Sequence, residues 1–300
     1  MPRIRQGNVV AHGDDYFFDA GYPITAKRVK STGTTTSHPH DLTEIEHEHD
    51  FCELVIVLGG MARHCLEGDH FPVAAGDVFL LQGRQRHYFY QRERLDLINV
   101  MYDPRRLNLP ENNLRKLPGY CAMFLLEPAF RGQHRFASRL HLDSVQLARV
   151  EQLAGEIARE TGTRLPGYEI TLTSRLLDLI ILLSRNYLGC ETTEARALMR
   201  MGRVIGSLEC EYHRTWTLEQ LYGLAHMSRS HFMRVFRRAT GQAPMAYLTN
   251  LRIRKAMDLL RSTDLNITEI AMNVGYNDSN YFTRQFKKVT QSTPGVFRKG

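Results

Sequence analysis

The sequence of 300 residues has no long run of apolar residues. A helix that crosses a membrane needs about 20 consecutive apolar residues. The longest apolar stretch here, 176–183, is interrupted by Asp178, and residues 1–7 lack the apolar segment of a secretory signal peptide. We therefore expect neither a membrane span nor a secretory signal.

Cysteine is scarce, and glycine and proline are not in excess. The five cysteines are odd in number, and no two of them form the CxxC pair of a redox or zinc motif. The 22 glycines and 11 prolines are too few for a collagen-like or low-complexity chain. We expect a globular chain in the reducing cytoplasm, with the thiols acting as small buried apolar groups.

Acidic residues are few in the C-terminal third. Residues 197–300 contain 16 Lys and Arg against 7 Asp and Glu, whereas the rest of the chain contains 23 against 25. The net charge of +7 therefore arises in this third alone. Such an excess is typical of a segment that binds a polyanion, although a solvated basic surface has the same composition.

Residues 217–241 predict two short helices joined by a tight turn. Thr217 and Ser228 are suitable N-caps for the first and the second helix, and Gly241 is a suitable end for the second. Apolar residues repeat at helical spacing in both segments. The residues expected to be buried are Leu218, Leu221, Leu224, Phe232, Val235 and Phe236.

The same pattern recurs about fifty residues later, which indicates an internal duplication. A short helix from Ile267 is followed by Gly275, which tolerates a positive φ in the turn, and by Asp278 or Ser279 as the cap of a second helix. Its expected core residues are Tyr281, Phe282 and Phe286, and Phe232, Arg234 and Phe236 align with Phe282, Arg284 and Phe286.

An amphipathic helix over 244–260 is expected to join the two units, with proline at its first turn. Its length is roughly 26 Å at about 1.5 Å per residue. This is comparable to the 34 Å or so that separates successive major grooves on one face of a duplex. One chain is thereby expected to contact two adjacent grooves.

Residues 198–299 resemble the DNA-binding domain of the AraC/XylS family of bacterial transcription regulators, above all in the segment IRKAMDLLRSTDLNITEIAMNVGYNDSNYFTRQFKKVTQSTPGVFR. Tyr222 and His226 depart from the family pattern, which usually has a small residue and a glycine there. The resemblance implies base contacts from Ser230, Met233, Arg234, Ser279, Asn280, Thr283 and Arg284. It implies phosphate contacts from Arg229, Arg237, Arg238, Lys287 and Lys288.

Residues 51–101 consist of short strand-like runs separated by glycine-containing turns. The expected strands are 53–58, 61–66, 70–73, 78–81 and 95–101. Runs of this length predict a small antiparallel barrel or sandwich, which can enclose one ligand.

This half resembles the cupin-like ligand-binding domain of the same family, whose fold is a jelly roll, and residues 47–102 are most similar to the L-rhamnose regulators within it. The expected fold class is α+β, with an N-terminal cupin-like β-barrel and flanking helices, and a C-terminal all-α domain of two helix-turn-helix units joined by a long helix. The expected domains are an effector-binding and dimerisation domain at 1–188, a linker at 189–197 and the DNA-binding domain at 198–300.

A group of histidines has three possible roles. His47, His49, Glu53 and His87 follow the pattern H-x-H-x3-E with a distant histidine, as in metal-binding cupins, and such ligands suit Zn, Fe, Mn or Ni. Gln82 and Arg84 stand where that pattern has proline and glycine. We favour hydrogen bonding to sugar hydroxyls over metal ligation or a structural role, so we expect no metal and no cofactor. Arg63, Arg84 and Tyr88 are further effector-binding candidates.

Two further amphipathic helices are expected at 143–161 and 170–186. They pack on the barrel, form a homodimer interface, or do both.

Taken together, the motifs predict a transcription regulator that is not an enzyme, more specifically an activator controlled by a small, rhamnose-like sugar. The expected partners are promoter DNA, the sugar, RNA polymerase and a second copy of the chain, without any membrane, in the cytoplasm with the nucleoid. The alternatives are a metal-binding cupin enzyme fused to a DNA-binding domain and a DNA-binding regulator that needs no effector.

Overall fold

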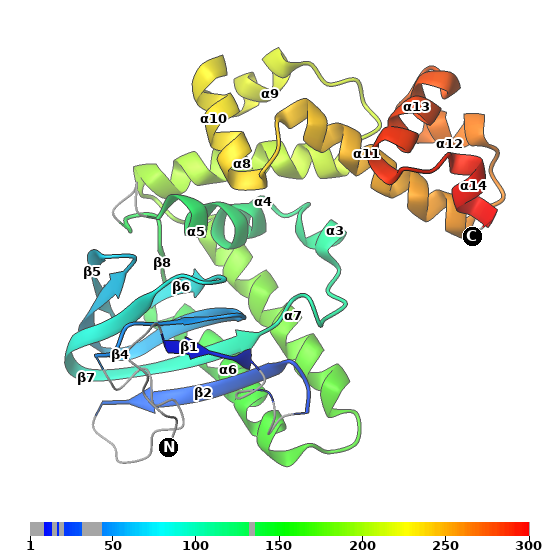
Figure 1. Ribbon diagram of the computed structural model, residues 1–300. Helices are drawn as coiled ribbons and strands as arrows, with labels where there is room; N and C mark the ends of the chain where they lie inside the picture. The colour runs from blue at the N-terminus through cyan, green and yellow to red at the C-terminus, as the bar shows by residue number, and fades with distance from the viewer. Residues whose placement is uncertain (1–8, 14–16, 18–20, 32–43, 132–135, 300) are drawn as a thin grey trace.

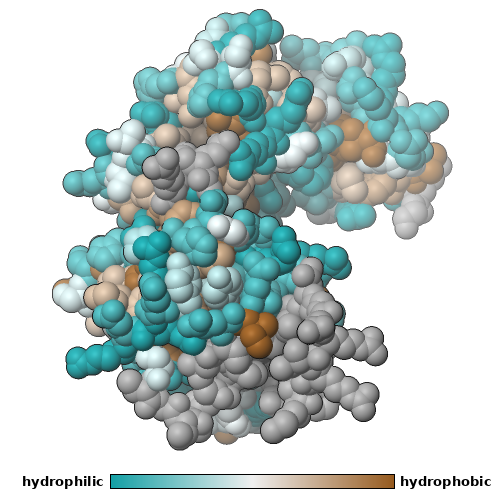
Figure 2. Space-filling model, turned by 60° about the vertical axis from the view of Figure 1, so that its left-hand side comes forward, coloured by the Kyte–Doolittle hydropathy of each residue, from teal (hydrophilic) through white to brown (hydrophobic). Residues whose placement is uncertain are grey.

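The computed structural model describes residues 9–13, 17, 21–31, 44–131 and 136–299. A sheet-rich N-terminal part and a helical C-terminal part are seen in Figure 1, and the last helices lie farthest from the sheet. No helix in the described ranges is long and apolar enough to cross a membrane. On the face drawn in Figure 2, hydrophilic residues predominate and hydrophobic ones form small separate patches. The α+β fold class is confirmed.

The N-terminal part is built on one sheet of eight strands in the order β1-β3-β7-β4-β6-β8, with β2 also paired to β7 and β5 to β4. Among the described residues, every strand pair is antiparallel except β1 with β3. The strands are β1 (Val9–Ala11), β2 (Ile24–Lys30), β3 (His47–His49), β4 (Cys52–Leu66), β5 (Asp69–Ala74), β6 (Asp77–Leu81), β7 (His87–Tyr102) and β8 (Leu140–His141).

The glycine pair at 59–60 predicts a break between two strands, and this prediction is wrong. Strand β4 runs through both glycines, and its pairing with β7 is irregular between Val57 and Arg63. Gly60 has a φ of +71°, and a Cβ atom there would overlap the backbone of Arg94. The glycines therefore bend the strand instead of ending it. Strand β7 likewise begins at His87, well before the expected start at 95.

The two faces of the sheet contribute to different cores. Leu54 and Ile56 belong to a large apolar cluster shared with the helices, whereas Val55 and Val57 belong to a second cluster on the inner face. Successive residues of a strand face opposite sides of the sheet. In this part of β4, even-numbered residues therefore face the helices and odd-numbered residues face the barrel interior.

Helices α6 (Ser144–Thr163) and α7 (Tyr168–Tyr187) pack on the outer face of the sheet (Figure 1). Asp143 begins α6 with a capping box. The two expected amphipathic helices are confirmed, to within a few residues at each end. Four shorter segments precede them: α3 (Glu111–Leu114), α4 (Pro118–Tyr120), the π-helix η1 (Cys121–Leu126) and α5 (Glu127–Phe130).

The C-terminal part contains both expected helix pairs and the long helix between them. Thr217 and Ser228 cap their helices, and Gly241 ends the second one with a φ of +72°. The caps, the duplication and the long helix are confirmed. The helices are α8 (Thr193–Cys210), α9 (Leu218–Leu224), α10 (Arg229–Thr240), α11 (Pro244–Ser262), α12 (Ile267–Asn273), α13 (Ser279–Thr290) and α14 (Pro294–Lys299).

Two expected core positions are wrong. Leu224 is 43% exposed and Tyr281 is 47% exposed. Three residues of an α-helix turn by about 300°, so Leu224, two such steps after Leu218, lies about 120° away from it around the helix and outside the buried stripe. Tyr281 lies one residue before the buried Phe282, which places it about 100° around the helix.

Helix α8 packs closely on the N-terminal part. A Cβ atom on Gly202 would overlap the carbonyl of Pro118 in α4. Helix α4 in turn lies against α7, where a Cβ atom on Gly119 would overlap the carbonyl of Ser184. The fully buried Glu209 accepts a hydrogen bond of 2.5 Å from the Tyr247 hydroxyl of α11, and burial raises the pKa of Tyr247. Only residues 188–192 separate α7 from α8. The division at 189–197 stays a prediction.

The contact at Gly202 leads to a stability prediction. We expect Gly202→Ala to lower the free energy of unfolding by about 1–3 kcal/mol, because the added methyl group is forced against backbone. Gly162→Ala is the matched control, since nothing lies within 4 Å of its added Cβ and a helical alanine is favoured by about 0.5–1 kcal/mol. Urea unfolding followed by circular dichroism measures both, and an unchanged midpoint for Gly202→Ala would contradict the close packing.

Candidate functional site

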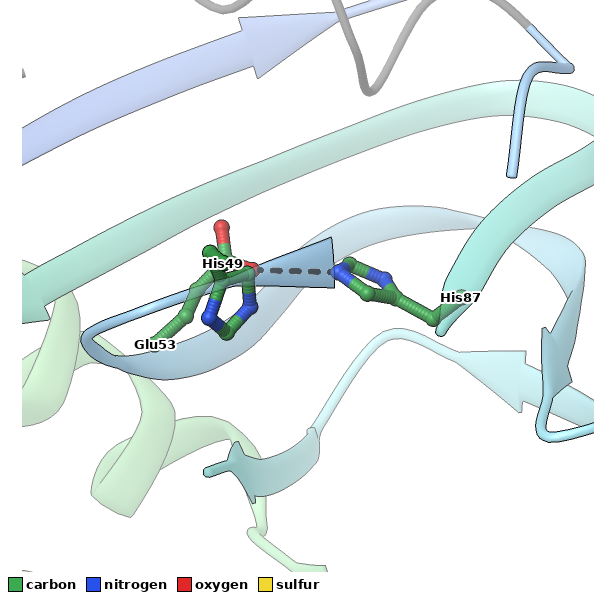
Figure 3. Close-up of side chains that lie close together, drawn as sticks. All are labelled: His49, Glu53 and His87. Carbon is green, nitrogen blue, oxygen red and sulfur yellow. Dashed lines mark ion pairs between the residues drawn. The ribbon is translucent and has the colours of Figure 1, made fainter. Parts of the chain in front are cut away.

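A cluster of ionisable side chains lies on the inner face of the sheet. Figure 3 shows His49, Glu53 and His87, which come from β3, β4 and β7 and point toward one another. The Nε2 atom of His49 is 3.2 Å from Oε2 of Glu53, and Nε2 of His87 is 3.6 Å from the same oxygen. All three side chains are 0–1% exposed.

Neighbouring groups hold these side chains in place. The Nδ1 atom of His49 donates to the Phe51 carbonyl at 2.9 Å, and the Asn99 amide donates to Oε1 of Glu53 at 2.5 Å. These bonds use Nδ1 of His49 and Oε1 of Glu53, so the other nitrogen and the other oxygen, Nε2 and Oε2, face each other.

Two more histidines border the cluster. The ring of His47 lies 4.3 Å from that of His87, between centroids, and the ring of His64 lies 5.5 Å from it. His47 pairs with His87 in register, and its Nδ1 lies 3.2 Å from the Ile45 carbonyl. His64 is fully buried and stacks on Phe89.

The structure thus brings together four of the effector-binding residues expected from the sequence, namely His47, His49, Glu53 and His87. His64 and Asn99 were not expected. Asn99 could have been found from its position two residues after Leu97 in β7, which places both on the inner face. His64 could not be found in this way, because its face depends on the bend in β4.

The structure does not bring Arg63, Arg84 and Tyr88 to this cluster. Arg63 donates to the Tyr90 hydroxyl at 3.3 Å, and the Arg84 side chain is 83% exposed. Tyr88 alternates with the inward His87 and Phe89 and is only partly buried. Their role in binding an effector stays a prediction.

The cluster is electrostatically unusual for a barrel interior. A buried carboxylate is costly unless cations or hydrogen-bond donors surround it. Here one carboxylate is surrounded by imidazoles, each of which can accept, donate or carry a charge. Such a set can bind hydroxyl groups, hold protons or bind a metal ion.

A second candidate surface lies on α10 and α13, the second helices of the two units. Most of the residues expected to contact DNA are exposed, whereas three are partly buried: Met233, Ser279 and Thr283. The exposed residues are Arg229, Ser230, Arg234, Arg237, Arg238, Asn280, Arg284, Lys287 and Lys288.

Several of these side chains have specific neighbours. The Arg284 guanidinium lies 5.8 Å from the centre of the Tyr281 ring, which accounts for a tyrosine on the surface. The Thr283 hydroxyl donates to the Ser279 carbonyl. Arg238 differs from the others, because its guanidinium lies 4.8 Å from the Phe130 ring of the N-terminal part.

The two units have the same turn with one difference in length. The Met227 amide donates to the Tyr222 carbonyl at 3.1 Å, and Tyr276 donates to Ala271 at 2.9 Å. His226, with a φ of +52°, corresponds to Gly275, with a φ of +90°. The first helices are 49 residues apart and the second helices 50, so the second turn contains one more residue.

Both parts match known families. The family model "AraC-like ligand binding domain" matches residues 29–109, and "Helix-turn-helix domain" matches residues 223–300. The chain is 28% identical over 286 residues to the HTH-type transcriptional activator RhaR of Shigella flexneri serotype 5b, covering 95% of this chain and 94% of the relative. RhaR of Escherichia coli K12 is 27% identical with the same coverage.

Among solved structures, the C-terminal domain of the two-component response regulator yesN from Fusobacterium nucleatum is 34% identical. The match covers 32% of this chain and 93% of that one, with a TM-score of 0.31.

The contact between Asn99 and Glu53 leads to a prediction. We expect Asn99→Leu to lower the free energy of unfolding by about 1–3 kcal/mol, because a buried carboxylate oxygen loses its donor. Arg63→Ala, on the opposite face of the same strand pair, serves as the control and changes stability by no more than about 0.5 kcal/mol. Urea unfolding of metal-free protein measures both, and equal effects would argue against a structural role for this hydrogen bond.

Proposed function

Since this chain belongs to the AraC/XylS family of transcription regulators, joining an AraC-like ligand-binding domain to a helix-turn-helix domain, we propose that it is a sequence-specific transcription activator controlled by a small effector. The observation that carries the proposal is the duplicated, capped helix pair with a basic exposed face on each second helix. Similarity to RhaR over nearly the whole chain supports the role of activator.

In this proposal α10 and α13 enter successive major grooves, and α11 sets the distance between them. Arg234 and Arg284 occupy equivalent exposed positions, from which an arginine is suited to a guanine edge. Asn280 is suited to an adenine edge, and Ser230, Met233, Ser279 and Thr283 complete the base contacts. The remaining basic residues of both helices, Arg229, Arg237, Arg238, Lys287 and Lys288, neutralise phosphates.

The N-terminal part, residues 1–188, is proposed to bind the effector and to form a homodimer. Two exposed apolar side chains at the connection between α6 and α7 support a partner surface there, since Leu165 is 64% and Ile170 is 75% exposed. As an activator, the bound protein contacts RNA polymerase.

The effector is proposed to be a small, rhamnose-like sugar. The support is the similarity of residues 47–102 to the L-rhamnose regulators and the polar cluster of His47, His49, Glu53 and His87 inside an apolar barrel. Hydroxyl groups of a sugar both donate and accept hydrogen bonds, as imidazoles do. Arg63, Arg84 and Tyr88 lie outside the cluster and remain part of the proposal only as residues at the rim.

An effector changes DNA binding only if it has different affinities for two arrangements of the chain. The contact of Arg238 with Phe130 is one that such a change can make or break, since it joins a phosphate-binding side chain to the N-terminal part.

Substitutions on α13 test the DNA contacts. We expect Arg284→Ala to weaken binding to the preferred duplex by about 1–3 kcal/mol and to relax the preference at one base pair. Lys287→Ala, one turn away, is the matched control and weakens all sequences alike, with a salt dependence lower by about one charge. Selection from random duplexes, followed by binding at several salt concentrations, measures both. An unchanged preference in Arg284→Ala would contradict its assigned role.

Calorimetric titration of L-rhamnose into the full-length chain tests the effector, with other sugars as controls. We expect saturable binding that is lost in His47→Ala and kept in His70→Gln, whose histidine lies on the exposed surface of β5. Absence of binding by any sugar would remove the sugar from the proposal and leave DNA binding in place.

A further inference from the structure

We propose that the barrel holds one divalent first-row transition-metal ion, bound by Nε2 of His49, Nε2 of His87 and Oε2 of Glu53. These three atoms all lie within 4.8 Å of one another, and their side chains are buried. They come from three different strands, so the site exists only in the folded barrel.

The spacing of the three atoms fits a common ion. Ligand atoms bound at about 2.0–2.1 Å in a tetrahedral arrangement lie roughly 3.3 Å apart. The separations here are 3.2 Å from His49 to Glu53 and 3.6 Å from His87 to the same oxygen. The third separation, between the ligand atoms of His49 and His87, is at most 4.8 Å, so these two rings have to move closer for all three atoms to bind one centre.

The hydrogen bond of His49 determines which of its nitrogens can bind a cation. The Phe51 carbonyl can only accept, so Nδ1 of His49 carries the proton in their 2.9 Å bond. In the neutral ring, Nε2 then presents a lone pair to Oε2 of Glu53, which is also an acceptor, at 3.2 Å. Two buried acceptors at this distance repel each other unless a proton or a metal ion lies between them.

A metal ion contacts more of the cluster than a proton does. A proton on His49 would pair this one ring with Glu53, whereas a dication binds His49, Glu53 and His87 together. The outer contacts are those that metal ligands make in proteins, with a carbonyl on the distal nitrogen of one imidazole and an amide on the second carboxylate oxygen. Phe51 and Asn99 therefore orient the two ligands.

The donor set indicates the kind of ion. Two imidazole nitrogens and one carboxylate oxygen suit Zn²⁺, Co²⁺, Ni²⁺, Mn²⁺ or Fe²⁺ rather than a soft ion such as Cu⁺. Three protein ligands leave at least one position of the ion open. When the ion is bound, these three side chains hold the metal, and a sugar hydroxyl would contact the open position of the ion and His47 instead of them. The inference does not depend on DNA binding.

The test uses full-length protein that is stripped with a chelator and then dialysed against Co²⁺. We expect about one Co²⁺ per chain by elemental analysis, visible absorption bands of a low-coordinate site, and a thermal midpoint raised by the metal. His49→Gln and Glu53→Gln are expected to lose the bound ion and the shift in midpoint. His70→Gln, a histidine outside the barrel interior, is the matched control and keeps both.

Wild-type protein provides a second measurement in case a variant does not fold. X-ray absorption at the cobalt edge is expected to show nitrogen and oxygen ligands with the scattering pattern of two imidazoles. Stripped wild-type protein that takes up neither Co²⁺ nor Zn²⁺, a sulfur ligand in the spectrum, or folded variants that bind as wild type does would each overturn the proposal. A failure of the metal proposal would be distinguishable from a failure of the proposed function, because the sugar titration and the DNA selection are separate measurements.

Discussion

The pairing of β4 with β7 is the constraint on which the interior of the barrel depends. In β4 the odd-numbered Glu53, Val55 and Val57 face inward before the glycine pair, whereas the even-numbered Ala62, His64 and Leu66 face inward after it. The irregular pairing at Gly59 and Gly60 produces this change. A strand without it would turn His64 away from His87, because a shift of one residue exchanges the two faces of a strand.

The structure of the helical part depends more on hydrogen bonds between residues close in sequence than the structure of the barrel does. Thr217, Ser228, Asn266 and Asp278 each accept hydrogen bonds from the first turn of the helix that follows, and they do so whatever the rest of the chain contributes. The residues that end or turn the helices also act locally, as Gly241 does with its positive φ. For this reason the helix pairs, their duplication and most of their buried residues could be predicted from the sequence.

Positions that depend on distant partners could not be predicted in this way. Two glycines in a row are as compatible with a turn as with a bend, and only the partner strand β7 decides between them. Tyr281 is aromatic and stands next to Phe282, but the guanidinium of Arg284 gives it a favourable place at the surface. The expected histidine group is brought together because the strands pair in the required register, which sequence spacing alone cannot establish.

The apolar clusters divide the chain at a place different from the expected boundary at 189–197. One cluster runs without interruption from the sheet and its helices into the first helix pair and the start of α11, as far as Leu251. A separate cluster begins at Ile253 and holds the second helix pair. The first helix pair therefore shares a core with the N-terminal part, whereas the second helix pair has a core of its own at the far end of α11. The second pair contacts the rest of the chain through α11 and through the residues just after α8, since Tyr212 packs on its cluster and a Cβ atom on Gly275 would overlap the backbone of His213. A movement of the first helix pair is therefore transmitted to the second pair along these two connections.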